Sequence, residues 1–365
     1  MRQQKSDLIP ITLLTGFLGS GKSTVLNHLI KQPDLFDALV IVNEFGEIGL
    51  DHLLVTHSAE TPVAQMNSGC MCCTIRSDLV KTLRDITWRF SRQGQRQFAR
   101  VVIETTGLAD PAPIINTIMT NQQIASKYKL DGIVTTVDMV NGADTLRKHH
   151  EAVKQVALAD VLLLTKTDLI NDSDRADFEN QLREINALAP HVTVNNGIVS
   201  PATVINLELG ATGKIRFGVN DIVSEENHAA HDHNHHHQDG EECHAQDHHH
   251  HVHHHAQDDG INSYCFSGQT PIPEDVLGEW LEILEGFMGD KILRVKGILN
   301  VEGHEQPVIV HGVQHILHPL SHLQSSAPDS RQSDLVFITQ NVDKAAIEHA
   351  FRQFPGVIPG AKQDN

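Results

Sequence analysis

Short apolar runs alternate with amphipathic helical patterns through residues 1–220. Each run is rich in Val, Ile and Leu and ends at a polar residue or a glycine. The runs predict strands, and the patterns between them predict helices. The strands are Ile11–Thr15, Leu39–Asn43, Val101–Glu104, Gly132–Val137 and Val161–Thr165, and the helices include Ser23–Lys31, Asp78–Phe90 and Arg175–Ala187. Alternating strands and helices form parallel sheets covered by helices, so this part predicts an α/β domain with a mostly parallel sheet.

The apolar pattern stops at Asp221 and resumes after Gly260. Residues 221–260 have almost no large apolar side chains, so they cannot bury enough surface to offset chain entropy and are predicted to be disordered. Residues 261–365 mix both patterns and predict a small α+β domain. Its strands are expected at Ile292–Leu299, Val308–His318 and Leu335–Thr339, and its helices at Pro273–Gly286 and Asp343–Gln353. The chain therefore divides into three parts, 1–220, 221–260 and 261–365.

Charge and histidine content set the middle part apart. The 365 residues include 28 Lys and Arg, 46 Asp and Glu and 26 His, for a formal charge of −18. Fourteen of the histidines, from His228 to His255, lie in residues 221–260 with ten carboxylates and no Lys or Arg. The acidic balance argues against a nucleic-acid partner. The imidazoles, with Cys243, favour metal capture by this insert over an inert solvated linker.

The sequence predicts a cytoplasmic protein that is not bound to a membrane. The first ten residues have no apolar signal region, and no apolar run approaches the ~20 residues that cross a bilayer. Three of the five cysteines lie in Cys70-Met71-Cys72-Cys73, a spacing that suits metal binding better than disulfides.

A phosphate-binding pattern, G-x-x-x-x-G-K-[ST], is matched by Gly16 to Ser23. An apolar strand precedes it and a helical pattern follows it, as this loop requires. Glycines let backbone N–H groups surround phosphate oxygens, Lys22 would reach the β- and γ-phosphates, and the Ser23 hydroxyl would bind Mg²⁺. The residues expected to bind the nucleotide here are Gly16, Gly19, Ser20, Gly21, Lys22, Ser23 and Thr24.

A second nucleotide-binding element is predicted where the strand Val101–Glu104 ends. Glu104 would hold Mg²⁺ directly or through water, and Gly107 would let the backbone approach the γ-phosphate. Lys22, Ser23 and Glu104 are therefore the expected catalytic group, while no residue stands out as the one that positions the attacking water.

The base is predicted to be guanine. Thr165-Lys166-Thr167-Asp168 follows a strand and is close to the N-K-x-D pattern of GTPases. The Asp168 carboxylate would accept hydrogen bonds from guanine N1–H and N2–H₂, which adenine does not offer. Thr165 replaces the Asn that mainly ties neighbouring loops together. Thr165, Lys166 and Asp168 are thus the expected base-binding residues.

With the segments Asn43–Asp51 and Asn67–Cys73 added, the sequence resembles the CobW-type GTPases, a family of cytoplasmic metal chaperones and metal-insertion proteins. The resemblance rests on the phosphate loop, N-E-F-G, G-C-x-C-C, Glu104-Thr-Thr-Gly107 and the base-binding loop. Arg294-Val-Lys-Gly297-Ile-Leu resembles the start of the family's C-terminal domain. The resemblance implies a P-loop NTPase fold, low intrinsic GTP hydrolysis, a metal-dependent client protein and, left open, a nucleotide- or metal-dependent homodimer.

Three thiols within four residues form a soft site for Zn²⁺ or a similar divalent ion. The family pattern makes Cys72 the leading ligand, with Cys70, Cys73 and the Glu47 carboxylate beside it. Val42 stands where some members carry a Glu, so one candidate ligand is missing. Co²⁺ is accepted by the same donors.

The position of the cysteine motif along the chain indicates how nucleotide and metal binding would be coupled. The cysteine motif lies between Asn43–Asp51, a predicted switch I, and Glu104–Pro111, a predicted switch II. We expect GTP hydrolysis to change the geometry of the cysteine site and so release metal to the client. Two alternatives stay open, a zinc store with nucleotide-regulated binding and a cobalt-insertion GTPase for cobalamin or nitrile hydratase assembly.

Histidines outside the insert are predicted to be ordinary. His311, His315, His318 and His322 have helical spacing, but the strand pattern over Val308–His318 breaks a metal-binding stripe. His149 and His150 are expected at an exposed helix end.

Overall fold

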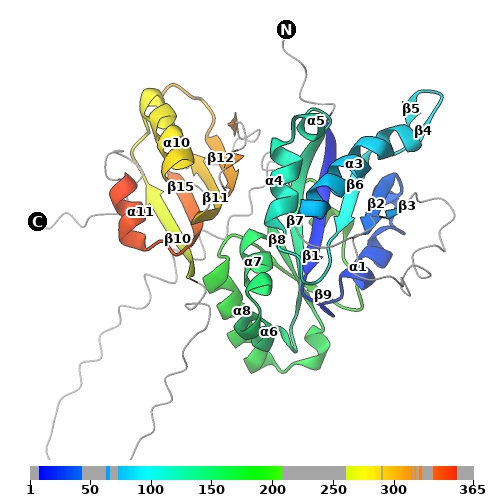
Figure 1. Ribbon diagram of the computed structural model, residues 1–365. Coiled ribbons are helices and arrows are strands. Elements are labelled where there is room, and N and C mark those ends of the chain that lie inside the picture. The colour runs from blue at the N-terminus through cyan, green and yellow to red at the C-terminus, as the bar shows by residue number, and fades with distance from the viewer. Residues whose placement is uncertain are drawn as a thin grey trace, which may run out of the picture.

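The computed structural model describes residues 8–42, 63–65, 73–207, 260–288, 291–314, 316–317, 320–322 and 332–351. The described residues form two large sheets with their own helices and a separate two-stranded hairpin, and Figure 1 shows the second large sheet lying beside the first. None of the described helices is both long and apolar enough to cross a bilayer.

The first sheet has seven strands in the order β3-β2-β6-β1-β7-β8-β9, and every neighbouring pair is parallel. This confirms the predicted α/β architecture. All loops that follow these strands therefore leave from one edge of the sheet, where nucleotides bind in such folds. The strands are β1 (Ile9–Gly16), β2 (Ala38–Val42), β3 (Val63–Gln65), β6 (Arg100–Glu104), β7 (Tyr128–Asp138), β8 (Val161–Thr165) and β9 (His191–Val194).

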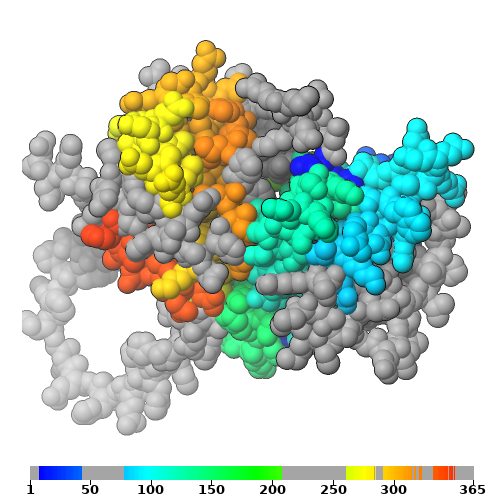
Figure 2. Space-filling model, turned by 45° about the horizontal axis from the view of Figure 1, so that its top comes forward, coloured from blue at the N-terminus to red at the C-terminus, as the bar shows by residue number. Residues whose placement is uncertain are grey.

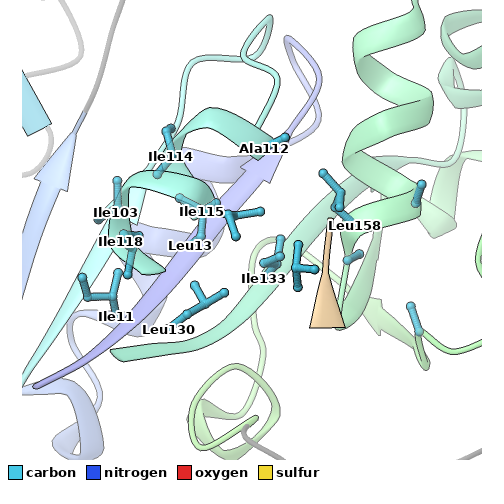
Figure 3. Packing of buried hydrophobic residues seen from close by; sticks show 14 of the residues in the cluster. Ile11, Leu13, Ile103, Ala112, Ile114, Ile115, Ile118, Leu130, Ile133 and Leu158 are labelled. Atoms are coloured by element: carbon cyan, nitrogen blue, oxygen red, sulfur yellow. The ribbon is translucent and has the colours of Figure 1, made fainter. Parts of the chain in front are cut away.

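Helices cover both faces of this sheet, because successive strand side chains point to opposite sides. Ile11, Leu13 and Ile103 face the helices α3 to α8, whereas Leu14 and Val102 face α1. Figure 3 shows Ile114, Ile115 and Ile118 of α4 packed on β1. The helices are α1 (Lys22–Leu29), α3 (Cys73–Arg89), α4 (Ala112–Thr120), α5 (Gln122–Ala125), α6 (Gly142–Lys148), α7 (His150–Leu158) and α8 (Asp172–Ile185), with short 3-10 turns η2 (Pro33–Leu35), η3 (Thr167–Leu169) and η4 (Pro201–Thr203).

The second sheet is antiparallel, with the order β10-β15-β11-β12-β13 and β14 paired with β12. One face packs on α10 and α11 through residues such as Phe266, Trp280 and Ile347. This confirms a separate C-terminal unit containing both strands and helices. Its elements are β10 (Ile261–Gly268), α10 (Glu274–Met288), β11 (Ile292–Leu299), β12 (Val308–Val313), β13 (Ile316–Leu317), β14 (Ser321–His322), β15 (Ser333–Gln340) and α11 (Lys344–Phe351).

The other face of the second sheet packs against the first domain. Ile261, Leu293 and Ile338 belong to the same buried cluster as Leu158 of α7. Figure 3 shows a strand of the C-terminal domain beside Leu158. The Arg294 guanidinium donates to the Leu158 carbonyl and to the Asp160 carboxylate, and Lys296 donates to the same carboxylate. The two domains therefore share a buried, charged interface.

The strand predicted over Val308–His318 is wrong in its length. β12 ends at Val313, Gln314 takes a positive φ of 54°, and β13 pairs back on β12. A tight turn here reverses the chain, so a single apolar run holds a hairpin rather than one strand. The predicted strands Val161–Thr165 and Ile292–Leu299 are present with their predicted bounds, and the other predicted strands and helices are present with shifted ends. The strands β3, β4 (Ser91–Arg92), β5 (Gln95–Arg96), β9, β10 and β14 were not predicted.

Candidate nucleotide-binding site

The phosphate loop lies where the sequence places it, between the end of β1 at Gly16 and the start of α1 at Lys22. Gly16 has a φ of 136°, and a Cβ there would lie 2.4 Å from the Thr136 carbonyl oxygen. Gly19 and Gly21 also have positive φ. Glycine is therefore required for the loop to turn tightly against β7.

Lys22 is held inside this loop and is only 8% exposed. Its Nζ donates to the carbonyl oxygens of Gly16 (2.9 Å) and Phe17 (3.0 Å). Burial lowers the pKa of Lys22 below its usual range, and the Glu104 carboxylate opposes that shift. The ammonium is thus fixed where the loop would enclose a phosphate group.

Ser23 and Glu104 meet although 81 residues separate them. The Ser23 hydroxyl donates to Glu104 Oε1 at 2.7 Å, and Glu104 is 6% exposed. A buried carboxylate beside a hydroxyl forms the hard oxygen donor set that Mg²⁺ prefers. The residues present therefore fit the predicted magnesium ion.

The predicted switch II, Glu104–Pro111, packs on the phosphate loop. A Cβ on Gly107 would lie 2.5 Å from the Leu18 nitrogen, so only glycine permits this approach. The Thr105 hydroxyl donates to Thr15 Oγ1 at 2.8 Å. The buried Thr106 hydroxyl finds no hydrogen-bond partner in the described part of the chain, so it can serve a ligand or water.

Thr165 ties the predicted base-binding loop to the phosphate loop. Its Oγ1 lies 2.9 Å from the Ser20 carbonyl and 3.1 Å from the Val137 carbonyl. The Ser20 hydroxyl in turn lies 2.6 Å from Thr136 Oγ1. The hydroxyl of Thr165 thus links the loops that the Asn of the GTPase pattern was expected to link.

Lys166 and Asp168 follow on the exposed side. Lys166 has a φ of 57°, and its Nζ donates to Asp138 Oδ2 at 2.6 Å. Burial raises the pKa of Asp138, but hydrogen bonds from Lys166 and Asn141 outweigh it and leave the pKa below the ordinary value. Asp168 lies in η3 and is exposed. Thr24 lies on α1, where Gly197 of the loop after β9 approaches its carbonyl.

Gln155 of α7 is a residue that the sequence analysis missed. It is 1% exposed, and its Nε2 donates to the carbonyl oxygens of Gly107 (3.2 Å) and Ala109 (2.9 Å) in switch II. It also lines a cavity of about 240 Å³ between the phosphate loop, the end of β7 and α6. Next to it, Lys154 pairs with Asp110 at 3.0 Å. Nothing in the sequence around Gln155 marks this role, because its partners lie more than 40 residues away.

Replacing Gln155 with Leu is expected to lower GTP hydrolysis about 5–10-fold with a small change in stability. The variant keeps the side-chain volume but loses two donors to switch II, worth about 1–1.5 kcal/mol in positioning. Phosphate release at saturating GTP measures the effect. Gln181→Leu on α8 is the matched control, and equal rates for the two variants would contradict the positioning role.

The predicted metal ligands are mostly outside the described residues. The structure does not describe Glu47, Cys70 and Cys72, whereas Cys73 is the first residue of α3. Within the ranges that the structure describes, no three His, Cys, Asp or Glu side chains are grouped to hold a metal ion. Because β3 is parallel to β2, the link from Gln65 to Cys73 leaves from the same sheet edge as the phosphate loop.

The prediction for His149 and His150 needs correction. His149 and His150 are half-buried rather than exposed, and the His149 ring lies 4.4 Å from the Phe17 ring of the phosphate loop. His150 Nε2 lies 3.3 Å from Gln340 Nε2 of β15. His311 Nε2 lies 3.2 Å from an Arg294 nitrogen, and His322 stacks on His304, while His315 and His318 lie outside the described residues.

Comparison with known proteins agrees with this geometry. Residues 10–193 match the family described as CobW/HypB/UreG, nucleotide-binding domain, and residues 261–354 match the cobalamin synthesis protein cobW C-terminal domain. The zinc chaperone YjiA of Escherichia coli is 32% identical over 94% of this chain and 98% of its own length. The zinc chaperone CobW of a Sinorhizobium species is 27% identical over 94% and 96%. The crystal structure of zinc-bound YjiA GTPase from E. coli is similar over 95% of this chain and 98% of its own, with 26% identity and a TM-score of 0.65.

Proposed function

Because this chain belongs to the CobW-type P-loop GTPase family and hydrolyses GTP, we propose that it is a zinc metallochaperone. In this proposal Cys70, Cys72 and Cys73, with Glu47, bind a zinc ion as cargo, and GTP hydrolysis drives its transfer to a client protein. The observation that carries the proposal is topological. The link that contains the cysteines leaves the sheet at the edge where the phosphate loop and switch II lie.

We assign the phosphate chemistry to Lys22, Ser23 and Glu104. The Lys22 ammonium neutralises charge on the β- and γ-phosphates and stabilises the charge that develops on the leaving oxygen. The Ser23 hydroxyl and the Glu104 carboxylate would hold Mg²⁺, which supplies further charge neutralisation when bound. Glycines of the loop direct backbone N–H groups at the phosphates, and Gln155 holds switch II in place.

We assign the choice of guanine to Asp168. Its exposed carboxylate is free to accept from guanine N1–H and N2–H₂. Lys166, fixed by Asp138, covers the base with its aliphatic stem, and Thr165 keeps this loop in register with the phosphate loop. In this proposal Asp168 binds the guanine base of GTP and Lys22 binds its phosphates.

The coupling predicts that zinc and GTP change each other's affinity. GTP affinity is measured with and without Zn²⁺ in the wild type and in Cys72→Ser. Zinc is expected to alter GTP affinity about 5–150-fold in the wild type, and GTP must alter zinc affinity by the same factor. The difference should disappear in Cys72→Ser.

Cys265→Ser on β10 is the matched control, because Cys265 is half-buried in the other domain. It should behave as the wild type. Equal GTP affinities in all variants, with and without zinc, would contradict the coupling.

A further inference from the structure

The outer surface of α3 and of the hairpin β4 (Ser91–Arg92) to β5 (Gln95–Arg96) concentrates positive charge. We name its exposed side chains the α3 basic face: Lys81, Arg84, Trp88, Arg89, Arg92 and Arg96. Residues 81–96 contain five cations and one carboxylate, on a chain with a formal charge of −18. The net charge of this region is therefore positive, whereas the net charge of the whole chain is negative.

Buried contacts of α3 hold the α3 basic face in place. Lys81, Arg84 and Trp88 follow helical spacing on one side of α3, whereas Leu79, Leu83 and Ile86 are buried on the other. The Tyr128 hydroxyl of β7 donates to the Leu83 carbonyl at 2.6 Å. The hairpin turns through Gln93 and Gly94, both with positive φ, and the Arg96 guanidinium lies 5.5 Å from the centre of the Phe98 ring.

The charges are available to a partner. Arg84 lies 3.4 Å from Asp85, but for Lys81, Arg89 and Arg92 no ion pair with another described residue is found. Trp88 is 80% exposed. An exposed tryptophan among arginines is typical of interaction surfaces. In Figure 1 the hairpin projects from the side of the first domain away from the C-terminal domain, and in Figure 2 this region lies at the molecular edge.

We propose that the α3 basic face binds the acidic, histidine-rich segment 221–259 of the same chain. That segment carries ten carboxylates and no Lys or Arg, so its charge is complementary to the face. Its histidines offer rings that pack on Trp88. This goes beyond the proposed metallochaperone function and holds whether or not the segment binds metal.

The attachment point of the segment supports this occupant. Leu207 is the last described residue before it, and the Leu207 amide donates to Asp131 Oδ1 at 3.1 Å. The neighbouring Asn206 accepts from Arg100 Nη2 at 3.2 Å, and Arg100 follows the hairpin by four residues. The chain therefore leaves the domain next to Arg100, the first residue of β6, the strand that the hairpin leads into.

The tether between Leu207 and the segment is longer than α3. Residues 208–220 can span up to ~45 Å when extended, whereas the 17 residues of α3 extend ~26 Å. A tether of this kind raises the local concentration of the segment to the millimolar range, where a modest electrostatic attraction is sufficient.

Trp88 reports directly on this contact. Trp280, the other tryptophan, is 3% exposed, so a Trp280→Phe chain leaves Trp88 as the sole probe. Acrylamide quenching is compared between this chain and one with residues 221–259 replaced by a Gly-Ser segment of equal length. The native segment is expected to lower quenching about twofold at low salt, independently of protein concentration. The protection should disappear in ~1 M NaCl and in Arg89→Glu/Arg92→Glu, but persist in the charge-matched control Lys148→Glu/Arg183→Glu.

Equal quenching with and without the native segment would overturn the proposal, as would protection that rises with protein concentration, which would indicate a second copy. Carbodiimide cross-linking of the unmodified protein is an independent measurement. We expect monomeric product that joins Lys81 to a carboxylate of 221–259, and its absence would likewise overturn the proposal.

Discussion

Lys22→Ala is expected to reduce GTP hydrolysis by about 10²–10³-fold. The Lys22 ammonium is fixed by the carbonyls of Gly16 and Phe17, so it meets the phosphates already positioned. Such a preorganised charge stabilises the transition state without reorganisation at the moment of reaction. Phosphate release under single-turnover conditions is the measurement.

The same variant separates two functions. If GTP hydrolysis drives zinc transfer, Lys22→Ala should retain zinc and fail to deliver it, whereas a zinc store would release metal as the wild type does. Lys31→Ala, an exposed lysine just beyond α1, is the control and should hydrolyse GTP normally. A Lys22→Ala rate within twofold of the wild type would contradict the assigned role.

The phosphate loop could be predicted because its information is local. Strand, glycine turn and helix follow one another within 21 residues, from Ile9 to Leu29, and each glycine meets a conformational need of its own backbone. The meeting of Ser23 and Glu104 was also predictable. A carboxylate at the end of a buried parallel strand emerges at the same edge as the phosphate loop.

Contacts on α7 could not be predicted in the same way. Gln155 binds carbonyls of switch II, and no side-chain pattern indicates which backbone atoms will be near. Asp160, just after α7, forms a buried ion pair with Arg294, which lies 134 residues later in the chain. A single carboxylate before a strand is usually exposed to solvent, so the sequence does not indicate this pair. The hairpin at Gln314 was missed because a tight turn was hidden in a continuous apolar pattern.

These contacts make α7 the structural link between the nucleotide site and the C-terminal domain. Beside its first residue, His149 lies against Phe17, its middle holds switch II through Gln155, and its last carbonyl, that of Leu158, accepts from Arg294. The predicted switch II and the domain interface therefore contact the same helix, α7.

Asp160→Asn is expected to lower the free energy of unfolding by about 3–5 kcal/mol. The Asp160 carboxylate faces two cations, Arg294 at 0% and Lys296 at 8% exposure. Burial raises the pKa of Asp160, but Arg294 and Lys296 outweigh it, so the pKa stays below the ordinary value. The variant leaves both cations buried without an anion. Urea unfolding followed by Trp280 emission, in a Trp88→Phe chain, measures the loss.

Lys296→Met provides the contrast, because it leaves Arg294 and Asp160 paired one to one. Burial lowers the pKa of Lys296 to about 8, with Asp160 opposing. Between this pKa and the unfolded value of ~10.4 the folded state binds fewer protons, so stability from this group rises with pH across that window. Lys296→Met should lose that rise and cost far less than Asp160→Asn at neutral pH. If both variants lowered the free energy of unfolding equally, the excess buried charge would not determine the stability of the interface.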